Sequence, residues 1–289
     1  MTVVKSNECQ RKLYIVATPI GNLADISQRA LDVLGEVDCV LCENTEHSLR
    51  LLRHFNIQPK SLQKLTDHES PERIQQYLHQ VGSGGIALIS DAGTPLMCDP
   101  GQRLVQIAHD QGFGVISVPG PCAVTAALAN CPFPVVPFRF LGFLPRKSGE
   151  RSQVMEALST TQDTLVFFES PHRLISCLQD CQQAFTAQRQ VFVVKELSKR
   201  FESFWHGSIQ SVLDTLSGDS IQGEFVVVIS GAEKRAADSV APTIDLDECL
   251  QALLKNGISP HSIVEMVSPI TEVRKNALYK RLLALKDGD

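Results

Sequence analysis

The chain of 289 residues is long enough for two domains, and its 43% hydrophobic and 20% charged residues are typical of folded globular proteins. No apolar run reaches the roughly 18–20 residues that cross a bilayer, and the polar residues 1–10 cannot form a signal peptide, so we expect a cytoplasmic protein without a membrane partner. The formal net charge of −5 excludes a surface that attracts nucleic acid everywhere, so RNA binding would require a local basic face.

The first 130 residues alternate short apolar runs with helical patterns. Strands are predicted at residues 13–17, 37–41, 86–90 and 115–118. A helix is predicted from Ile26 onward, with Asp25 as its N-cap, and another at residues 48–55. Repeated strand, turn and helix favour a mostly parallel sheet with helices on both faces, so the predicted fold class is α/β.

Prolines within residues 131–137 break any helix and predict a domain boundary. Beyond them, strands at residues 165–168, 191–194 and 225–229 and a helix at residues 171–184 predict a second α/β domain. A linker at residues 237–242 is expected to lead to three short helices around Leu250, Ile263 and Leu278, which would form a small bundle or a helix-turn-helix unit. The predicted domains are residues 1–131, 132–235 and 236–289.

The nine cysteines favour packing roles over metal binding. Cys39 and Cys42 fall in a predicted strand, where residues three apart point to opposite faces, and no second Cys or His pair follows at zinc-finger spacing. Cys177 and Cys181 are spaced to share one face of a helix. We therefore expect reduced cysteines and no metal.

Clusters of basic residues are candidates for a local RNA-binding face, although each is also explained as solvated surface. They are Arg146, Lys147 and Arg151, then Lys195, Lys199 and Arg200, and finally Arg274, Lys275, Lys280 and Arg281. Charge alone therefore neither supports nor excludes an RNA partner.

Four Gly- or Pro-rich segments follow or end predicted strands, where open α/β sheets bind their ligands. They are residues 17–22 (ATPIGN), 90–95 (SDAGTP), 118–123 (VPGPCA) and 167–173 (FFESPHR). None matches the dinucleotide fingerprint or the phosphate loop, which argues against nicotinamide-dependent redox chemistry and ATP hydrolysis. Each is ordinary turn chemistry by itself, but together they predict an enzyme cleft for an uncharged or zwitterionic ligand, with Asp91 and Glu169 as its acidic members.

These segments together resemble the tetrapyrrole-methylase superfamily, and within it the bacterial branch that 2′-O-methylates a cytidine in the decoding region of small-subunit rRNA. The matching stretches are residues 13–34 (LYIVATPIGNLADISQRALDVL), 87–100 (ALISDAGTPLMCDP), 118–123 (VPGPCA), 141–147 (LGFLPRK), 165–174 (LVFFESPHRL) and 223–229 (GEFVVVI). Residues 275–280 (KNALYK) resemble the small C-terminal helix-turn-helix module of that branch.

The resemblance implies two α/β domains with S-adenosylmethionine (SAM) in the cleft between them, a homodimer, and 16S rRNA or the 30S subunit as partner. Carried over by position, the cofactor pocket would contain Pro19, Gly21, Asp91, Ala92, Gly93, Thr94, Pro95, Pro121, Cys122, Ala123, Phe168 and Glu169. A ribose hydroxyl is weakly acidic, so a base or a cation that stabilises the oxyanion is expected. The candidates are Glu43, Asn22, Glu196 and Lys199, and the residues do not choose between them.

The chain departs from the family pattern after the second predicted strand. The family carries Glu-Asp-Thr-Arg followed by His, whereas this chain has Glu43, Asn44, Thr45, Glu46 and His47. If the usual Arg contacts phosphate, Glu46 would repel it and weaken RNA binding. Two alternatives therefore stay open: a SAM-dependent methylase of another substrate, such as a corrin precursor or a modified protein residue, and a catalytically impaired relative that binds SAM or RNA.

Overall fold

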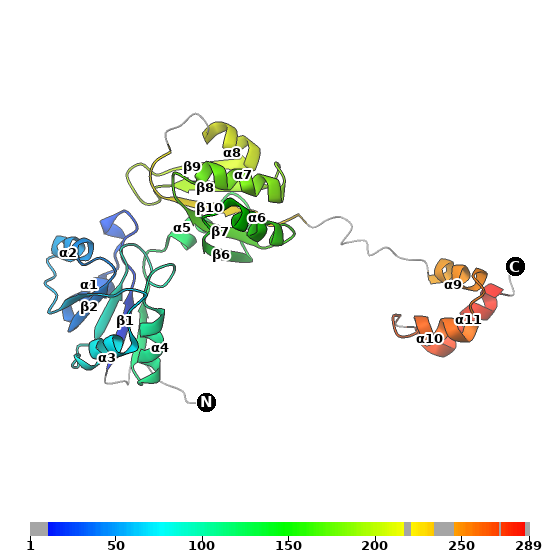
Figure 1. Ribbon diagram of the computed structural model, residues 1–289, viewed down its shortest axis with the longest axis horizontal. Helices are drawn as coiled ribbons and strands as arrows, with labels where there is room; N and C mark the ends of the chain where they lie inside the picture. Colours follow the sequence, from blue (N-terminus) through cyan, green and yellow to red (C-terminus); the bar gives the residue numbers. More distant parts are fainter. Residues whose placement is uncertain (1–10, 217–220, 234–245, 272, 287–289) are drawn as a thin grey trace. The chain divides into compact units, whose positions relative to one another are not determined.

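The computed structural model describes residues 11–216, 221–233, 246–271 and 273–286 (Figure 1). The chain forms two compact units, Met1–Ala232 and Glu233–Asp289. The first unit contains two five-stranded sheets with their helices, and the described part of the second is helical. The predicted linker at residues 237–242 and the polar residues 1–10 lie outside the described residues.

The first sheet has the strand order β3-β2-β4-β1-β5, and every neighbouring pair is parallel. Its strands are β1 (Lys12–Val16), β2 (Cys39–Cys42), β3 (Leu62–Lys64), β4 (Ile86–Ile89) and β5 (Gly114–Val118). All residues of β2 and β4 are buried, as expected for central strands that helices cover on both faces. The mostly parallel sheet predicted for the first half of the chain is confirmed.

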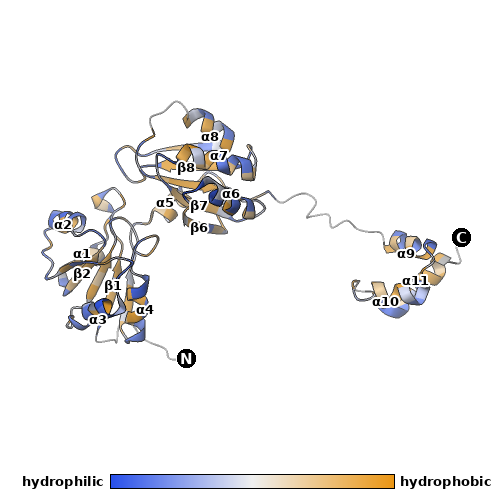
Figure 2. Cartoon of the chain, viewed as in Figure 1, coloured by the Kyte–Doolittle hydropathy of each residue, from blue (hydrophilic) through white to orange (hydrophobic). Residues whose placement is uncertain are grey.

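Alternating strand residues face two separate cores of this sheet. One core joins Leu41 and Leu88 to the helices α3 and α4, and the other joins Val40 and Ile89 to α1 and α2. Figure 2 shows the strands in hydrophobic colours and hydrophilic residues on the helices. The helices are α1 (Gln28–Glu36), α2 (Thr45–His54), α3 (Pro71–His79) and α4 (Gln102–Asp110).

The structure corrects the expected start of the first helix. Ser27, not Asp25, is the N-cap of α1, and its hydroxyl accepts a hydrogen bond from the Ala30 amide at 3.2 Å. Asp25 ends a short 3₁₀ turn, η2 (Leu23–Asp25), and its carboxylate accepts a hydrogen bond from the Ser198 hydroxyl. Asp25 therefore contributes to contacts with the second half of the chain instead of capping the helix.

The second sheet has the strand order β6-β7-β10-β8-β9. Its strands are β6 (Phe138–Phe143), β7 (Thr164–Glu169), β8 (Gln190–Lys195), β9 (Ser203–Ser208) and β10 (Phe225–Ile229). Only β6 and β7 run parallel, while β10 is antiparallel to both β7 and β8, and β8 is antiparallel to β9. The second sheet is thus mixed, unlike the first, and a short connection without a crossover helix joins β8 to its antiparallel neighbour β9.

Helices cover both faces of the second sheet. The face that contains Phe167 packs against α6, α7 and α8, and the face that contains Val166 packs against α5. These helices are α5 (Ala123–Ala129), α6 (Ser148–Ala157), α7 (Leu174–Phe185) and α8 (Ile209–Leu216). Arg151 of α6 is 3% exposed and pairs with Asp180 of α7 at 2.5 Å. It therefore does not belong to a basic surface, contrary to its place among the candidate clusters.

The described part of the second unit consists of α9 (Leu246–Lys255), α10 (Pro260–Val267) and α11 (Lys275–Lys286), so the three expected short helices are confirmed. They share a core built around Leu250, Ile263, Leu278 and Leu282. Gly257, with a φ of +78°, lies just after α9, where a left-handed residue ends the helix.

The described cysteines are all free, and Cys39 and Cys42 lie in different cores, as the alternation of a strand requires. Cys177 and Cys181 are both buried on α7; their contact and the burial raise the pKa of the Cys177 thiol. The described residues contain no cluster of three or more potential metal-ligating side chains. None of their helices is long and apolar enough to span a membrane.

Candidate active site

Three of the predicted turns meet at the carboxyl edge of the first sheet, after the adjacent strands β4, β1 and β5. Thr18 and Gly93 form a pair of backbone hydrogen bonds of 2.9 and 3.0 Å, which joins the turns after β1 and β4. The Thr94 hydroxyl donates to the Pro121 carbonyl at 3.1 Å and joins the turn after β5. Side-chain and backbone hydrogen bonds therefore hold the three segments in one fixed arrangement.

Gly93 occupies a sterically restricted position in the turn after β4. Its φ is +80°, and a Cβ atom there would lie 3.2 Å from Ile20 Cγ2 and 3.7 Å from the Pro121 carbonyl oxygen. Both the backbone conformation and the close approach require glycine.

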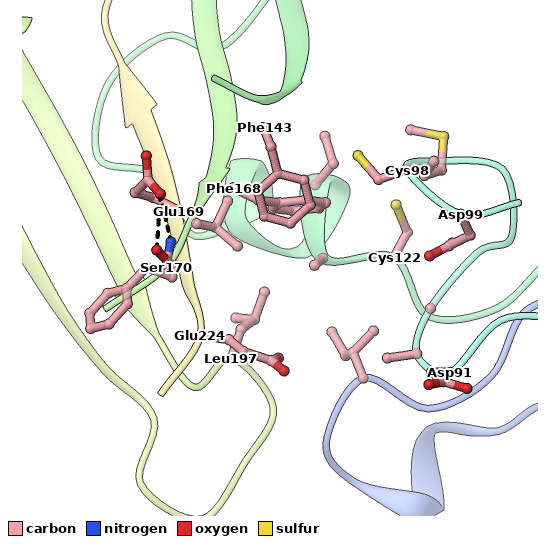
Figure 3. A pocket seen from close by; sticks show the side chains of 18 of the residues that line it. Asp91, Cys98, Asp99, Cys122, Phe143, Phe168, Glu169, Ser170, Leu197 and Glu224 are labelled. Atoms are coloured by element: carbon pink, nitrogen blue, oxygen red, sulfur yellow. Dashed lines mark hydrogen bonds between the residues drawn. The ribbon is translucent and has the colours of Figure 1, made fainter. Parts of the chain in front are cut away.

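A cavity of about 380 Å³, here called the carboxyl-edge pocket, lies beside these turns. Asp91, Asp99, Cys98 and Cys122 lie on one side of it, and the aromatic ring of Phe168 lies on the other (Figure 3). Its lining comprises Ile20, Asp91, Ala92, Gly93, Thr94, Met97, Cys98, Asp99, Cys122, Ala123, Val124, Phe143, Phe168, Glu169, Ser170, Pro171, Leu197, Gly223, Glu224, Phe225 and Val226. The pocket thus combines an apolar side from the second sheet with an acidic, turn-lined side from the first.

Aromatic contacts build the apolar side. The Phe168 ring lies 5.6 Å from that of Phe143 and 5.0 Å from that of Phe140, measured between centroids, in tilted or edge-on geometry. Phe143 is 59% exposed although it is large and apolar. An exposed aromatic side chain at the edge of a cavity suits contact with a flat ligand surface.

Carboxylates concentrate on the acidic side. Burial, together with charge repulsion from Glu43 and Asp91, raises the pKa of Asp99 to about 6, although a hydrogen bond with Ser90 opposes this shift. Burial, Asp91 and Asp67 likewise raise the pKa of Glu43. Asp91 Oδ1 is buried and has no hydrogen-bond partner among the described residues. A buried acceptor without a partner is costly, so Asp91 is suited to a ligand that donates a hydrogen bond.

A second cavity, here called the α2 pocket, has a volume of about 400 Å³. It is lined by Pro19, Ile20, Gly21, Leu23, His47, Arg50, Leu51, His54, Asp91, Ala92, Lys199 and Glu224. Ile20, Asp91, Ala92 and Glu224 also line the carboxyl-edge pocket, so the two cavities adjoin.

Lys199 lies where the two halves of this unit meet. Its ammonium group pairs with Glu196 at 2.9 Å and with Glu224 at 3.1 Å. Burial alone would lower the pKa of Lys199, but hydrogen bonds to the two carboxylates outweigh it and raise the pKa. A Cβ atom on Gly21 would lie 2.3 Å from Lys199 Cγ, so the glycine allows the lysine to approach the turn after β1.

The Glu-Ser-Pro-His-Arg segment has a clear local role. The Glu169 side chain is fully buried, accepts a hydrogen bond from the Ser170 amide at 2.8 Å and pairs with Arg173 at 3.1 Å. Arg173 also donates to the carbonyls of Leu144 and Pro145, both at 3.0 Å. Arg173 therefore attaches the segment after β6 to the segment after β7.

Comparison with known proteins decides the family. The profile of the Tetrapyrrole (Corrin/Porphyrin) Methylases matches residues 12–213. This chain belongs to the tetrapyrrole methylase family. Curated relatives from several bacteria are named ribosomal RNA small subunit methyltransferase I. The protein from Vibrio cholerae is 40% identical over 93% of both chains, and that from Escherichia coli O157:H7 is 38% identical over 96% of both. The protein is therefore a methyltransferase.

Solved structures agree on the fold of the methylase. A cobalt precorrin-4 methyltransferase superposes with a TM-score of 0.56 at 17% identity, covering 80% of this chain and 98% of its own. The uroporphyrin-III C-methyltransferase of Thermus thermophilus, complexed with S-adenosylhomocysteine, has a TM-score of 0.50 at 16% identity, covering 75% of this chain and 96% of its own.

Most residues predicted for the cofactor line one of the two cavities of the methylase. Asp91, Ala92, Gly93, Thr94, Cys122, Ala123, Phe168 and Glu169 line the carboxyl-edge pocket, and Pro19 and Gly21 line the α2 pocket. Pro95 is buried behind the turn, and Pro121 contributes its carbonyl to Thr94, but neither lines these two pockets.

Of the four predicted catalytic residues, Lys199 and Glu196 are joined by an ion pair, whereas Asn22 and Glu43 are not part of that contact. Lys199 lines the α2 pocket, and Glu196 lies behind it as its ion-pair partner. Asn22 caps the 3₁₀ turn η2 by accepting from the Ala24 amide at 3.1 Å. Glu43 follows β2 beside the acidic side of the carboxyl-edge pocket, without lining either cavity.

Sequence reasoning missed several lining residues. Those of the carboxyl-edge pocket include Met97, Cys98, Asp99, Phe143, Leu197 and Glu224, and those of the α2 pocket are Ile20, Leu23, His47, Arg50, Leu51, His54 and Glu224. Asp99 and Glu224 lie within the stretches that resemble the family, residues 87–100 and 223–229, and this position could have indicated that they line the site. The helical spacing of residues 47, 50 and 54 places them on one face of a helix, but it does not indicate whether that face meets solvent or a cavity.

Proposed function

We propose that this methyltransferase transfers a methyl group from SAM to the ribose 2′-hydroxyl of a cytidine in the decoding region of 16S rRNA. The observation that carries the proposal is the near full-length match to the rRNA small subunit methyltransferase I relatives, up to 96% of both chains. The structurally similar cobalt precorrin methylase instead leaves about a fifth of this chain uncovered. The same proposal includes the small ribosomal subunit as substrate, a homodimer and a cytoplasmic location. It also includes three domains at residues 1–131, 132–235 and 236–289.

The carboxyl-edge pocket has the features that SAM binding requires. Its size is within the range of small-ligand sites, its turns expose backbone groups, and Phe143 and Phe168 offer an apolar surface to an adenine ring. Asp91 Oδ1 is a buried acceptor without a partner among the described residues, which suits a ribose hydroxyl or an ammonium group. A complex of a protein of this fold with S-adenosylhomocysteine supports the assignment.

SAM would supply an electrophilic methyl group, and the protein's task is then to position the ribose oxygen and stabilise its developing charge. Lys199 is suited to the second role because its raised pKa keeps it cationic and it lines the adjoining pocket. Glu196 and Glu224 would hold its ammonium group in position. Among the four predicted catalytic residues we therefore favour Lys199, with Glu196 as a positioning residue; Asn22 and Glu43 are kept as weaker candidates.

Labelled SAM and 30S subunits from a strain that lacks this methylation test the proposal. The parent protein is expected to label one cytidine ribose, located by mapping of the 2′-O-methyl group. Lys199→Ala should lower kcat by roughly 100-fold without changing SAM affinity, because a transition-state contact is lost. Arg29→Ala, a change of an exposed basic residue on α1 outside both pockets, should behave like the parent. Methylation of a corrin precursor with no label in 30S subunits would contradict the proposal.

A further inference from the structure

The α2 pocket has a chemical character that the cofactor does not explain. Its apolar members Ile20, Leu23 and Leu51 lie together with the basic side chains of His47, Arg50 and His54. A nucleotide has a similar division, with a flat base whose faces pack against apolar side chains and an anionic phosphate. The pocket is concave, so it suits a nucleotide that is unstacked from its neighbours rather than one within a duplex.

The basic side chains come from one face of one helix. His47, Arg50 and His54 are spaced by three and four residues, so successive turns of α2 present them to the same cavity. α2 begins directly after β2, where Asn44 accepts hydrogen bonds from the amides of Glu46 and His47. The cap fixes the first turn of the helix and thereby the face that lines the pocket.

Arg50 differs from the other cation of this pocket in its partners. Lys199 is paired with two carboxylates, whereas Arg50 is exposed and forms no ion pair with any carboxylate of the described chain. An unpaired guanidinium beside a cavity is suited to bidentate hydrogen bonding with phosphate oxygens.

The α2 pocket also lies next to the pocket proposed for the methyl donor. The α2 pocket shares Ile20, Asp91, Ala92 and Glu224 with the carboxyl-edge pocket, so a ligand in one lies beside a ligand in the other. We propose that the α2 pocket binds the nucleotide that becomes methylated, and that Arg50 contacts the RNA phosphate next to it. This inference rests on the proposed function and assigns the substrate side of that site.

This assignment also changes the effect on RNA binding that is expected of Glu46. Glu46 is exposed but does not line the α2 pocket, and it lies in the first turn of α2, where an acidic side chain favours the helix. The positive charge that serves the substrate lies one turn further along the helix, at Arg50. The acidic residue at position 46 therefore leaves the phosphate contact in place.

Steady-state methylation of unmethylated 30S subunits at several KCl concentrations and constant Mg²⁺ tests the inference. Arg50→Ala should raise KM for 30S subunits about tenfold, because a hydrogen bond to a charged group is lost, and should change kcat and SAM affinity little. The slope of log KM against log salt should fall by about 0.7, the value for one phosphate contact on a single strand. Arg50→Lys should recover part of the loss, because it keeps the charge.

Arg53→Ala provides the matched control. Arg53 is also exposed on α2 and carries the same charge, but it does not line the α2 pocket, so its removal should leave KM and the salt slope close to those of the parent. Equal changes in the Arg50→Ala and Arg53→Ala variants, or no change in either, would overturn the inference while the proposed function stands. A parent protein that methylates no 30S subunit would overturn both.

Discussion

Asp99 holds its proton at a pH where an ordinary aspartate is charged. Its pKa is raised from 3.8 to about 6, so between these values the folded protein binds more protons than the unfolded chain. The charged form is less favourable in the folded state, and the contribution of Asp99 to stability therefore falls as the pH rises from about 4 to 6.

Replacing Asp99 should accordingly stabilise the protein at neutral pH. Asp99→Asn is expected to raise the melting temperature at pH 7.5 by a few degrees, equivalent to about 1 kcal/mol after solvent screening of a partly exposed site. The gain should shrink as the pH approaches 4. Melting curves of parent and variant across this pH range measure it, with Asp32→Asn on the exposed side of α1 as control. A gain that is independent of pH would refute the electrostatic explanation.

Replacement of Gly93 should weaken SAM binding for a steric reason. Gly93→Ala combines a strained φ of +80° with a Cβ contact of 3.2 Å to Ile20, so the turn has to move. SAM affinity measured by calorimetry should drop by at least about tenfold. Gly149→Ala, where a Cβ would meet nothing within 4 Å, should bind SAM like the parent. Unchanged affinity in Gly93→Ala would show that this turn does not contact the cofactor.

At the scale of elements, the buried pair of Arg151 and Asp180 joins α6 to α7. The Asp180 carboxylate also accepts two contacts of 3.1 Å from the Ser148 hydroxyl, and Arg151 donates to the carbonyls of Pro145 and Arg146. Removing one partner leaves the other charged and buried, which typically costs several kcal/mol.

Arg151→Ala should therefore destabilise the protein by about 3–5 kcal/mol in urea unfolding. The double change Arg151→Met with Asp180→Leu should recover much of that loss, because no buried charge remains unpaired. Arg139→Ala breaks the more exposed pair with Asp163 and should cost no more than about 1 kcal/mol. Similar losses from Arg151→Ala and Arg139→Ala would contradict the role of burial.

Burial also explains which strands were predictable from the sequence. The central strands β2, β4, β8 and β10 are nearly continuous apolar runs, because both of their faces are covered. β3, β6 and β9 lie at sheet edges, where half-buried and exposed residues remove the apolar signal. The reversal of β10 within the second sheet depends on long-range pairing, which local patterns do not encode.

The residues of the candidate site also divide into those that the sequence predicts and those that it does not. Turn residues such as Gly93 and Asp91 were predictable because backbone conformations at strand ends restrict the sequence. Arg50 and His54 were not, because a basic helix face has the same pattern whether it meets solvent or a cavity. Arg151 was misassigned for the converse reason, since its partner Asp180 lies 29 positions away in the chain.

At the scale of the whole molecule, every lining residue of both pockets belongs to the unit Met1–Ala232. The helices α9 to α11 have their own core around Leu250 and Leu278. The two units therefore have separate sources of stability.

A protein truncated after residue 233 is consequently expected to fold and to bind SAM with the affinity of the full chain, within about twofold. In the full chain, Leu278→Asp should unfold the second unit, because a charge enters its core, and should leave SAM affinity unchanged. Calorimetry and circular dichroism on both proteins give the measurement. A loss of SAM affinity in either would demonstrate that the units depend on one another.

The residues common to the two pockets have a thermodynamic consequence. Both cavities are lined by Ile20, Asp91, Ala92 and Glu224. A ligand that orders these residues in one cavity therefore lowers the entropic cost of binding a ligand in the other cavity. Such coupling is reciprocal: the factor by which the methyl donor strengthens RNA binding equals the factor by which RNA strengthens binding of the donor. The enzyme would accordingly bind its two substrates cooperatively.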